Sequence, residues 1–428
     1  MHIPSHKHSL FLAGDTMLTQ PWSELDDPDF LALIAEMRAA DATILNLETV
    51  IHTFKGYPQA DCGGTYMTSP PQIASELRWA GVNMVSHANN HAFDYGSIGV
   101  LETLEHSRGE GLIVAGTGEN LQEAQSPRFS KNTAVTVALV SMASTFIRYG
   151  AASPARHDVQ GRPGVNPLRV SRRPEVTITP RCRAVLGSFA HFMGRESARY
   201  EHDLFQIGPL CFRTGRKLAL EAGWRIDSRD RERNLANIES AHRSASVTVV
   251  AIHAHKHHTC LRQFSHKAIE RGADVVVVHG PHEVRGIELH AGKPIFYCLG
   301  DFVYQPDQVS RLPAEAYEQI GMSANASIEE YIGDGKRFDL RRKPSVYESV
   351  AAVVDYAVNT PCKIRLIPVD LQFDAPYRIR GRPRWATPEL GRRIIARLAS
   401  LSARYRCSVA YDPVLNCGFI ELPRARRT

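Results

Sequence analysis

The strongest constraint on the fold of this chain is a series of short apolar segments that each end in side chains costly to bury. Five such segments are predicted strands, and they end in Asp15, in Asn46 with Glu48, in the run from His87 to His91, in His253 with His255, and in His279 with His282. Buried polar groups need partners. In open α/β sheets a ligand site lies beyond the carboxyl ends of the strands. We therefore expect these residues to meet at one site.

Helical patterns separate the apolar segments, and this alternation predicts an α/β fold with largely buried strands. The expected helices are residues 29–40, a helix from an N-cap at Ser69 to about residue 80, and residues 99–106, 229–245, 261–272 and 387–405. Thr387 followed by Pro388 is a typical helix start. A hairpin is expected with its turn at residues 291–293.

The alternation stops at about residue 148, which divides the chain of 428 residues. The expected parts are 1–148 and 246–305 as two halves of the main domain, 149–245 as an arginine-rich insertion with a helix, 306–345 as a loop or lid, and 346–428 as strands and a helix that complete the same domain. Arginines of the insertion, with Arg162 and Arg169 as candidates, suit an anionic small-molecule or polymer substrate. A solvated basic loop explains them equally well.

The bulk composition narrows the class of partner. There are 51 Lys and Arg against 45 Asp and Glu, a net charge of +6. This mild excess does not indicate a nucleic-acid partner, and it is compatible with an anionic substrate. The sequence shows no signal peptide, no apolar stretch long enough to span a membrane, and eight cysteines without a CxxC pair. We therefore expect a cytoplasmic protein with reduced thiols.

The residue types at the strand ends point to a metal. Carboxylate, amide oxygen and imidazole suit Mn, Fe, Zn or Mg better than soft copper. Two divalent ions ~4 Å apart can activate water and stabilise an in-line displacement. A single strand-end histidine is more often a hydrogen-bonded core residue, and His-Ala-Asn-Asn-His alone could be an Asx-rich turn. The joint pattern at five strands favours the metal site.

Five motifs occur in an order that resembles the CapA family of capsule-biosynthesis or poly-γ-glutamate synthesis proteins. They are GDTML at 14–18, NLE at 46–48, ANNHAFDYG at 88–96, HGPH at 279–282 and GKPIFYCLGDF at 292–302. That family is similar to calcineurin-like metallophosphoesterases. The resemblance implies a four-layer α/β/β/α sandwich with a two-metal centre, whose ligands would be Asp15, Glu48, Asn90, His253, His279 and His282. It also implies that His91 contacts the substrate or leaving group and that Asp94 orients His91.

This chain departs from the family pattern at two places near the site. The family usually has an acid near residues 253–257, where this chain reads HAHKHH, so His255 or His257 would replace it. Asp301 stands where the family usually has asparagine, and we add Asp301 and Asn46 as further site candidates. We predict a metal-dependent hydrolase that acts on a phosphoester or another anionic substrate. Amide-bond chemistry on γ-glutamyl or similar substrates, and a non-catalytic role in a synthase complex, remain alternatives.

Overall fold

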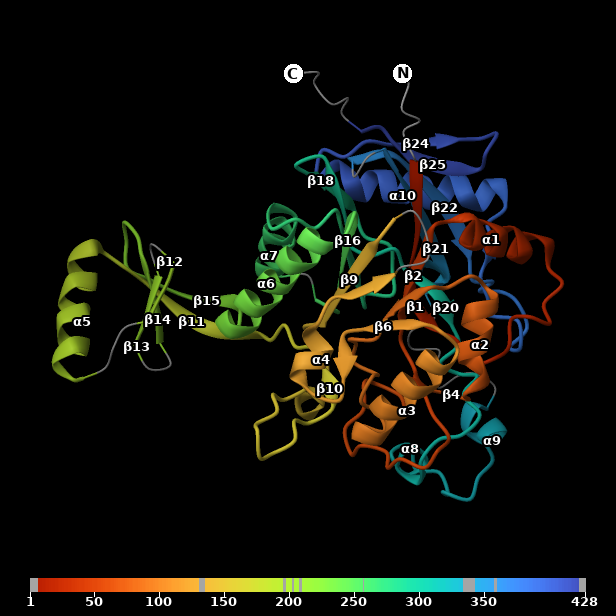
Figure 1. The fold of residues 1–428 in the computed structure, drawn as a ribbon, viewed down its shortest axis with the longest axis horizontal. Coiled ribbons are helices and arrows are strands. Elements are labelled where there is room, and N and C mark those ends of the chain that lie inside the picture. Colours follow the sequence, from red (N-terminus) through yellow and green to blue (C-terminus); the bar gives the residue numbers. More distant parts are fainter. Residues whose placement is uncertain are drawn as a thin grey trace. The chain divides into compact units, whose positions relative to one another are not determined.

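The computed structural model describes residues 7–130, 135–194, 198–201, 204–207, 210–256, 258–333, 343–357 and 360–422. The chain divides into two compact units (Figure 1). The larger unit comprises Met1–Pro167, Asn234–Lys256 and Ser265–Thr428, and the smaller comprises Leu168–Arg233 and His257–Phe264. Both units mix helices and strands, so the predicted α/β class is confirmed.

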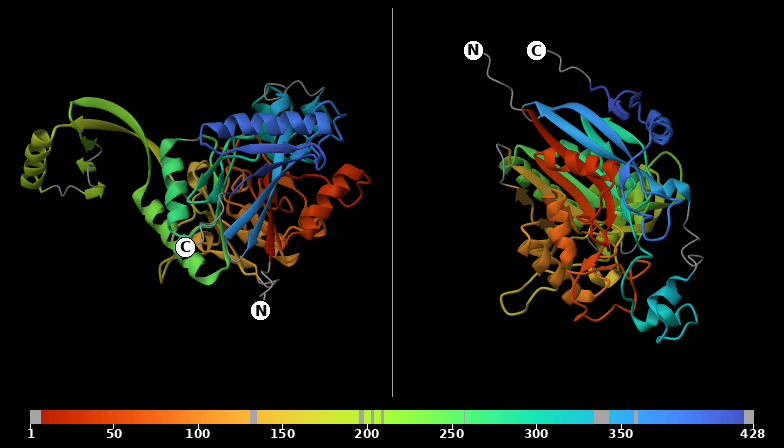
Figure 2. Two further views of the ribbon diagram at one scale, coloured as in Figure 1. Left: turned by 90° about the horizontal axis from the view of Figure 1, so that it is seen from above. Right: turned by 90° about the vertical axis from the view of Figure 1, so that its right-hand side faces the viewer.

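The first sheet of the larger unit has ten strands within the described residues. Its main order is β24 (Val409–Asp412), β25 (Cys417–Ile420), β22 (Thr360–Asp370), β21 (Glu348–Ala357), β1 (Lys7–Met17), β2 (Ala42–Leu47), β5 (Met84–Ser86) and β6 (Ile113–Ala115). In addition, β20 (Asp301–Tyr304) pairs with β1, and β23 (Arg384–Trp385) pairs with β22. Strands β1, β2, β5 and β6 are parallel, whereas β21 joins β1 antiparallel. The C-terminal strands therefore lie beside the N-terminal one (Figure 2).

The second sheet of the larger unit has six strands within the described residues. Their order is β18 (Ile287–His290), β19 (Lys293–Phe296), β17 (Val275–His279), β16 (Val247–His253), β9 (Val137–Ala143) and β8 (Arg128–Ser130). Strands β9, β16, β17 and β19 are parallel. The predicted hairpin is β18–β19, and its turn residues Ala291 and Gly292 have φ of 51° and 76°. Two successive left-handed residues are what a type I′ hairpin turn requires.

Helices and short strands connect these sheets. The remaining elements of the larger unit are α1 (Pro28–Ala39), β3 (Val50–Ile51), β4 (Thr68–Ser69), α2 (Gln72–Trp79), α3 (Gly96–Gly109), β7 (Thr117–Gly118), α4 (Leu121–Gln125), η1 (Arg148–Gly150), β10 (Gly164–Val165), α8 (Ala314–Glu318), α9 (Ile328–Ile332), η3 (Pro344–Tyr347) and α10 (Pro388–Ala403). Helices α6 (Ser228–Ser244) and α7 (Thr259–Glu270) each include residues of both units.

The helix starts follow local chemistry, with one correction. The Thr387 side chain caps α10 by accepting from the Leu390 N–H, as the sequence predicts. The predicted cap at Ser69 is wrong, because Ser69 belongs to the buried strand β4 and its hydroxyl donates to the Leu18 carbonyl. Helix α2 instead begins at Gln72, without a side-chain cap.

The ten-stranded sheet is apolar on both faces. One face packs on α1, α2 and α3, in a core that includes Phe11, Phe30 and Leu77. The other face packs against the six-stranded sheet, in a core that includes Leu12 and Val249. A helical layer and two facing sheets are thus present, and the strands are buried on both sides, as continuous apolar runs predict.

Within its described residues, the smaller unit contains a five-stranded sheet that sequence patterning did not reveal. Its order is β12 (Ala198–Glu201), β13 (Leu204–Ile207), β14 (Leu210–Thr214), β11 (Val170–Ile178) and β15 (Ala219–Ile226). Helix α5 (Pro180–Phe192) contributes Leu186 to a small cluster with Ile178 and Phe212. This unit lies within the region predicted as an arginine-rich insertion, apart from residues 257–264.

The predicted loop or lid at 306–345 is less irregular than the sequence suggests. It contains the short helices α8 and α9, the second of which has a capping box between Ser327 and Glu330. Residues 334–342 of this segment lie outside the described residues. A lid function for the segment stays a prediction.

The aromatic contacts under the ten-stranded sheet provide a test of the core. Phe30 is fully buried and lies edge-on to Trp22, with ring centroids 5.9 Å apart. We expect Phe30→Ala to lower the free energy of unfolding by about 3–5 kcal/mol, because it removes apolar contacts and leaves a cavity. Tyr57→Ala is the control, since that side chain is exposed, and it should change stability by about 0.5 kcal/mol or less. Equal losses in urea denaturation would contradict this packing.

Candidate metal centre

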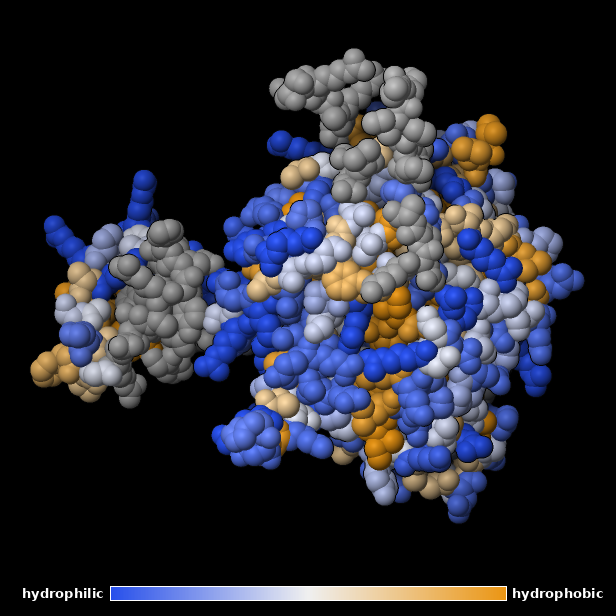
Figure 3. Space-filling view, viewed as in Figure 1, coloured by the Kyte–Doolittle hydropathy of each residue, from blue (hydrophilic) through white to orange (hydrophobic). Residues whose placement is uncertain are grey.

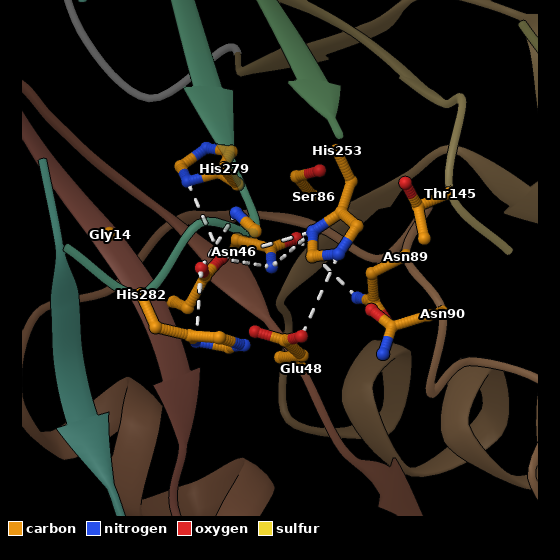
Figure 4. A network of polar contacts seen from close by, with 12 residues as sticks. Gly14, Asn46, Glu48, Ser86, Asn89, Asn90, Thr145, His253, His279 and His282 are labelled. Atoms are coloured by element: carbon orange, nitrogen blue, oxygen red, sulfur yellow. Dashed lines mark hydrogen bonds and ion pairs between the residues drawn. The ribbon is translucent and has the colours of Figure 1, made fainter. Parts of the chain in front are cut away.

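The site forms where strands of both sheets of the larger unit end. Asp15 of β1 and Asn46 of β2 are register partners, and the Asn46 amide donates to the Asp15 carboxylate over 2.7 Å. His253 and His279 end the parallel strands β16 and β17 and are also register partners. Figure 4 shows the side chains of Glu48, His253 and His282 turned toward one another. The sheet edges therefore gather residues that are far apart in sequence.

In the described part of the chain, two groups of potential ligands lie within this site. One group is Glu48, His253 and His255, and the other is Asp15, Glu48 and His282. In each group the ligand atoms lie within 4.8 Å of one another. Glu48 belongs to both groups, so its carboxylate is the potential ligand that they share.

Several ligand atoms are buried without a hydrogen-bond partner in the part of the chain that the structure describes. They are both carboxylate oxygens of Glu48, Nε2 of His253, Nδ1 of His279 and Oδ2 of Asp301. A buried, unpaired carboxylate costs several kcal/mol. Divalent ions that accept oxygen and nitrogen ligands would satisfy these atoms. The residues present thus fit a metal centre by both chemistry and burial.

Burial sets the protonation of the candidate ligands. It raises the pKa of Asp15 to about 6, with the charge of Asp301 adding to the effect, and it raises the pKa of Glu48. The same loss of hydration lowers the pKa of His279 to about 3 and lowers that of His253. Neutral imidazole has a lone pair to donate. At neutral pH these two histidines are therefore ready to bind a cation.

His282 is held differently from the other histidines. Its Nδ1 lies 2.8 Å from Oδ1 of Asp301. Burial alone would lower the pKa of His282, but the charge and hydrogen bond of Asp301, helped by Glu48 and Asp15, raise it to about 10. Because Asp301 engages Nδ1, the other ring nitrogen is the one left for a cation. Such a carboxylate–histidine pair fixes the orientation of a metal-ligating ring.

The turn that carries His282 leaves no space beside the histidines. Gly280 has φ of +108°, and its N–H donates to Oδ2 of Asp15 over 2.8 Å. A Cβ atom there would lie 2.8 Å from the His255 ring and 3.1 Å from Nε2 of His253. Glycine is therefore required both by the backbone conformation and by the two rings.

The run from His87 to His91 divides between structural and site roles. His87 is buried, with Nδ1 next to the Thr117 hydroxyl and Nε2 next to the Thr49 carbonyl, and burial lowers its pKa to about 4. It is thus a core histidine. Asn90 instead faces the site, with Oδ1 3.3 Å from Nε2 of His255.

His91 and Asp94 form the pair that the family resemblance implies. Nδ1 of His91 lies 2.7 Å from Oδ2 of Asp94, and both side chains are buried. Asp94 also accepts hydrogen bonds from the backbone N–H groups of Gly63 and Met67. These bonds fix the carboxylate, which in turn fixes the ring and leaves Nε2 to act on another group.

Sequence reasoning missed the segment that supports this pair. Besides the bond to Asp94, the Gly63 carbonyl accepts from the Asn90 side chain over 2.8 Å. A Cβ at Gly63 would lie 2.8 Å from Nδ1 of His91. The adjacent glycines at 63 and 64 were the one available signal, and they indicate close backbone approach only weakly.

The remaining predicted site residues are less directly placed. His255 belongs to a ligand group, and its backbone N–H donates to the Thr145 hydroxyl. His257 lies outside the described residues. The Arg162 guanidinium donates to the Ala151 carbonyl. The Arg169 guanidinium pairs with Asp230, with atoms 2.9 Å apart. These arginines make structural contacts, and their role in substrate binding stays a prediction.

The larger unit thus has a candidate metal centre at the strand ends of an α/β fold, and comparison with known proteins identifies its family. The family model described as bacterial capsule synthesis protein PGA_cap matches residues 9–306. The chain belongs to this family, which confirms the CapA resemblance seen in the motifs.

Curated relatives extend the similarity. Two uncharacterized proteins of Sinorhizobium fredii, y4sH and y4uA, are each 29% identical over 425 residues, covering 94% of this chain and 91% of their own. The PGA biosynthesis protein CapA of Bacillus subtilis is 25% identical over 272 residues, which cover 62% of this chain and 54% of that protein. The capsule biosynthesis protein CapA of Bacillus anthracis is 20% identical, over 71% of this chain and 61% of its own. The chain thus spans less than two thirds of either CapA protein.

A hypothetical protein from Thermus thermophilus is similar to this chain among solved structures. The TM-score is 0.37 at 13% identity, over 85% of this chain and 99% of that one. Among the described residues, no helix is both long enough and apolar enough to cross a bilayer.

The close fit at Gly280 predicts a specific loss of metal affinity. We expect Gly280→Ala to weaken binding of Mn²⁺ or Zn²⁺ by about 10- to 100-fold, because its methyl group displaces the rings of His253 and His255. Gly292→Ala is the matched control: its φ is also positive, but no atom lies within 4 Å of the added methyl group. The positive φ alone should cost both variants about 1–2 kcal/mol of stability, and the contact with the two rings should add to the loss of Gly280→Ala. Equal metal affinities in calorimetric titrations would show that position 280 does not support the ligands.

The contact between Asp301 and His282 predicts a proton-release signature. A cation that takes a nitrogen of His282 must displace a proton, because the pKa of about 10 keeps the ring cationic at neutral pH. Asp301→Asn removes the charge that raises this pKa, so fewer protons should be released on binding of Mn²⁺ or Zn²⁺. Calorimetry in buffers of different ionisation enthalpy measures this number.

The control for this experiment is Asp274→Asn. Asp274 is also a buried carboxylate, but it pairs with Lys293 at the start of β17, whereas the site lies at the end of that strand. This variant should release as many protons as the unmodified protein. Equal proton release by the Asp301 variant would mean that the carboxylate does not hold the cationic ring.

Proposed function

We propose that the protein is a metal-dependent hydrolase with two divalent ions, of Mn, Fe, Zn or Mg, that share Glu48. The observation that carries the proposal is the presence of two ligand groups joined at a buried carboxylate whose oxygens have no hydrogen-bond partner in the described residues. Asp15 and His282 would complete one position, His253 and His255 the other. Asn90 and His279 would be additional ligands, consistent with their place beside His255 and Asp15.

The chemistry follows from the cations and the neighbouring pair. Divalent ions at these positions would lower the pKa of a coordinated water and neutralise charge on an anionic substrate. Asp94 fixes Nδ1 of His91, so Nε2 is the atom that would donate a proton or a hydrogen bond to the leaving group. Asn46 would hold Asp15 in its ligating orientation through their 2.7 Å hydrogen bond.

A phosphoester is the substrate class that we favour. Two adjacent cations suit the in-line displacement of a leaving group from phosphorus, and the family motifs resemble metallophosphoesterases. In keeping with that resemblance, we also propose that the larger unit is a four-layer α/β/β/α sandwich, to which the helical layer and the two facing sheets would belong. Arg162 and Arg169 remain candidates for substrate contact.

Amide-bond chemistry is the second candidate. The observation that favours it is the name of one relative, the PGA biosynthesis protein CapA of Bacillus subtilis. A γ-glutamyl chain is anionic like a phosphoester, and its carbonyl carbon would be the electrophile. The ligand groups and the His91–Asp94 pair would serve either reaction.

The first test is metal content, because both candidates need it. We expect about two ions per chain in protein supplied with Mn, Fe or Zn, and loss of metal in Asp15→Ala and His282→Ala. His157→Ala is the control, since His157 is an exposed histidine outside both ligand groups. Absence of metal from the unmodified protein would refute the proposal.

The second part of the test separates catalysis from a scaffold role. Phosphoesters and γ-glutamyl amides are assayed with His91→Ala, which should keep its metal and lose about 10²–10⁴-fold in rate. Asp94→Asn should lose about 10–100-fold, since it supports the ring without touching substrate. Hydrolysis of the amide alone would select the second candidate. Metal-loaded protein inactive on both substrate classes would favour the accessory role.

A further inference from the structure

Helix α5 of the smaller unit is apolar on two sides. One side packs inward through Leu186 and the buried Ala190. The other side exposes Val185, Phe189, Phe192 and Met193, whose side chains are 69%, 59%, 84% and 56% accessible. The spacing of four and three residues places Val185, Phe189 and Phe192 on one stripe of the helix, and Met193 follows as its C-cap. Apolar residues are visible on the surface of α5 in the view of Figure 3.

A helix whose apolar residues extend beyond the side that packs on its own sheet is expected to be covered there as well. Single exposed apolar residues are normal, but a contiguous stripe with two phenylalanines is typical of an interaction site. Within the described residues of the smaller unit, the sheet accounts for the inner side of α5 only. The outer stripe, Val185 to Met193, therefore needs a partner.

The net positive charge of the protein resides in the smaller unit. Its residues, 168–233 and 257–264, include 15 Lys and Arg against 8 Asp and Glu, a net charge of +7. The whole chain has +6, so the larger unit has a net charge of −1. A partner for this unit is therefore expected to be anionic.

Exposed basic residues lie next to the start of α5. Two hydrogen bonds hold the end of β14 near the start of α5. Arg183 of α5 donates to the hydroxyl of Thr214, the last residue of β14, over 2.7 Å, and the N–H of Gly215, the first residue of the following loop, donates to the carbonyl of Ile178, at the end of β11. The same loop exposes Arg216, Lys217 and Leu218. Basic and apolar groups therefore occur together at the first turn of α5, where Arg181 is exposed as well.

We propose that the outer stripe of α5 and the loop Arg216–Leu218 form a docking surface for an anionic lipid bilayer. Aromatic and aliphatic side chains would enter the boundary between headgroups and acyl chains, while the flanking arginines and lysine meet anionic headgroups. A second copy of this chain would bring another unit of +7 against the first, which like-charge repulsion disfavours. A free anion in water would leave the phenylalanines uncovered.

Vesicle cosedimentation of the full-length protein tests the proposal. The probes are phosphatidylcholine vesicles with and without phosphatidylglycerol. Unmodified protein should bind the anionic vesicles and lose binding at high salt. Phe189→Ser with Phe192→Ser should reduce binding at least about tenfold. Arg216→Gln with Lys217→Gln should reduce it roughly fivefold per charge removed.

Matched controls separate docking from misfolding. Val414→Ser with Leu415→Ser changes two exposed apolar residues of the larger unit, and this variant should bind vesicles like the unmodified protein. All variants should keep their far-ultraviolet circular dichroism and their metal content, because none of the substituted residues belongs to the metal centre. If the phenylalanine variant misfolds, the Arg216→Gln, Lys217→Gln variant and the salt dependence of the unmodified protein still test whether this surface binds anionic vesicles.

Three outcomes would overturn the proposal. The first is failure of the unmodified protein to bind anionic vesicles, and the second is equal binding to neutral and anionic vesicles. The third is unchanged binding by both the Phe189→Ser, Phe192→Ser variant and the Arg216→Gln, Lys217→Gln variant. Dimers that dissociate on Phe189→Ser with Phe192→Ser, without vesicle binding, would show that a second copy covers the stripe. Selective anionic binding that both variants lose would support it.

Discussion

The candidate metal centre is governed by three carboxyl groups that the larger unit buries where its two sheets end. Asp15, Glu48 and Asp301 are all fully buried. Asp15 has the N–H of Gly280 and the amide of Asn46 as donors, and Asp301 has His282, but Glu48 has no hydrogen-bond partner in the described residues. Burial raises the pKa values of Asp15 and Glu48, because an unpaired buried carboxylate is costly when no cation neutralises it. Bound cations would have the same carboxylates as ligands and would offset the cost of their burial.

The sheet architecture explains why the charge can be held there. Parallel strands end at one edge, and two facing sheets bring two such edges together. Strand β1 passes very close to Gly300, because a Cβ atom at Gly14 would lie only 1.7 Å from the Gly300 carbonyl oxygen. This close approach keeps Asp15 next to β20 and Asp301. The ligands are thus carried by strands whose positions are set by apolar cores on both sides. A site on rigid elements keeps its geometry better than one on loops.

Sequence patterns predicted this part of the fold because its physics is local. Apolar runs predicted β16 and β17, and Thr387 with Pro388 predicted the start of α10. The five-stranded sheet of the smaller unit was missed because β11 reads Val-Ser-Arg-Arg-Pro-Glu-Val-Thr-Ile, without a continuous apolar run. The strand-end pattern predicted that Asp15, Glu48, His253, His279 and His282 lie close together, but it also included His87, which lies in the core. It did not predict the contact of Asp301 with His282 or the support from Gly63, because both depend on turns and on close backbone approach.

The run from His87 to His91 shows what a motif alone leaves open. Its two histidines are both buried and only four residues apart, yet Thr117 and Thr49 occupy both nitrogens of His87, whereas Asp94 engages only Nδ1 of His91. The difference arises after strand β5, where the chain turns. There the Asp94 carboxylate accepts hydrogen bonds from two backbone N–H groups of the segment 63–67. A histidine can act on a substrate only if one nitrogen remains for it. The tertiary contacts of each ring therefore separate the site residue from the core residue.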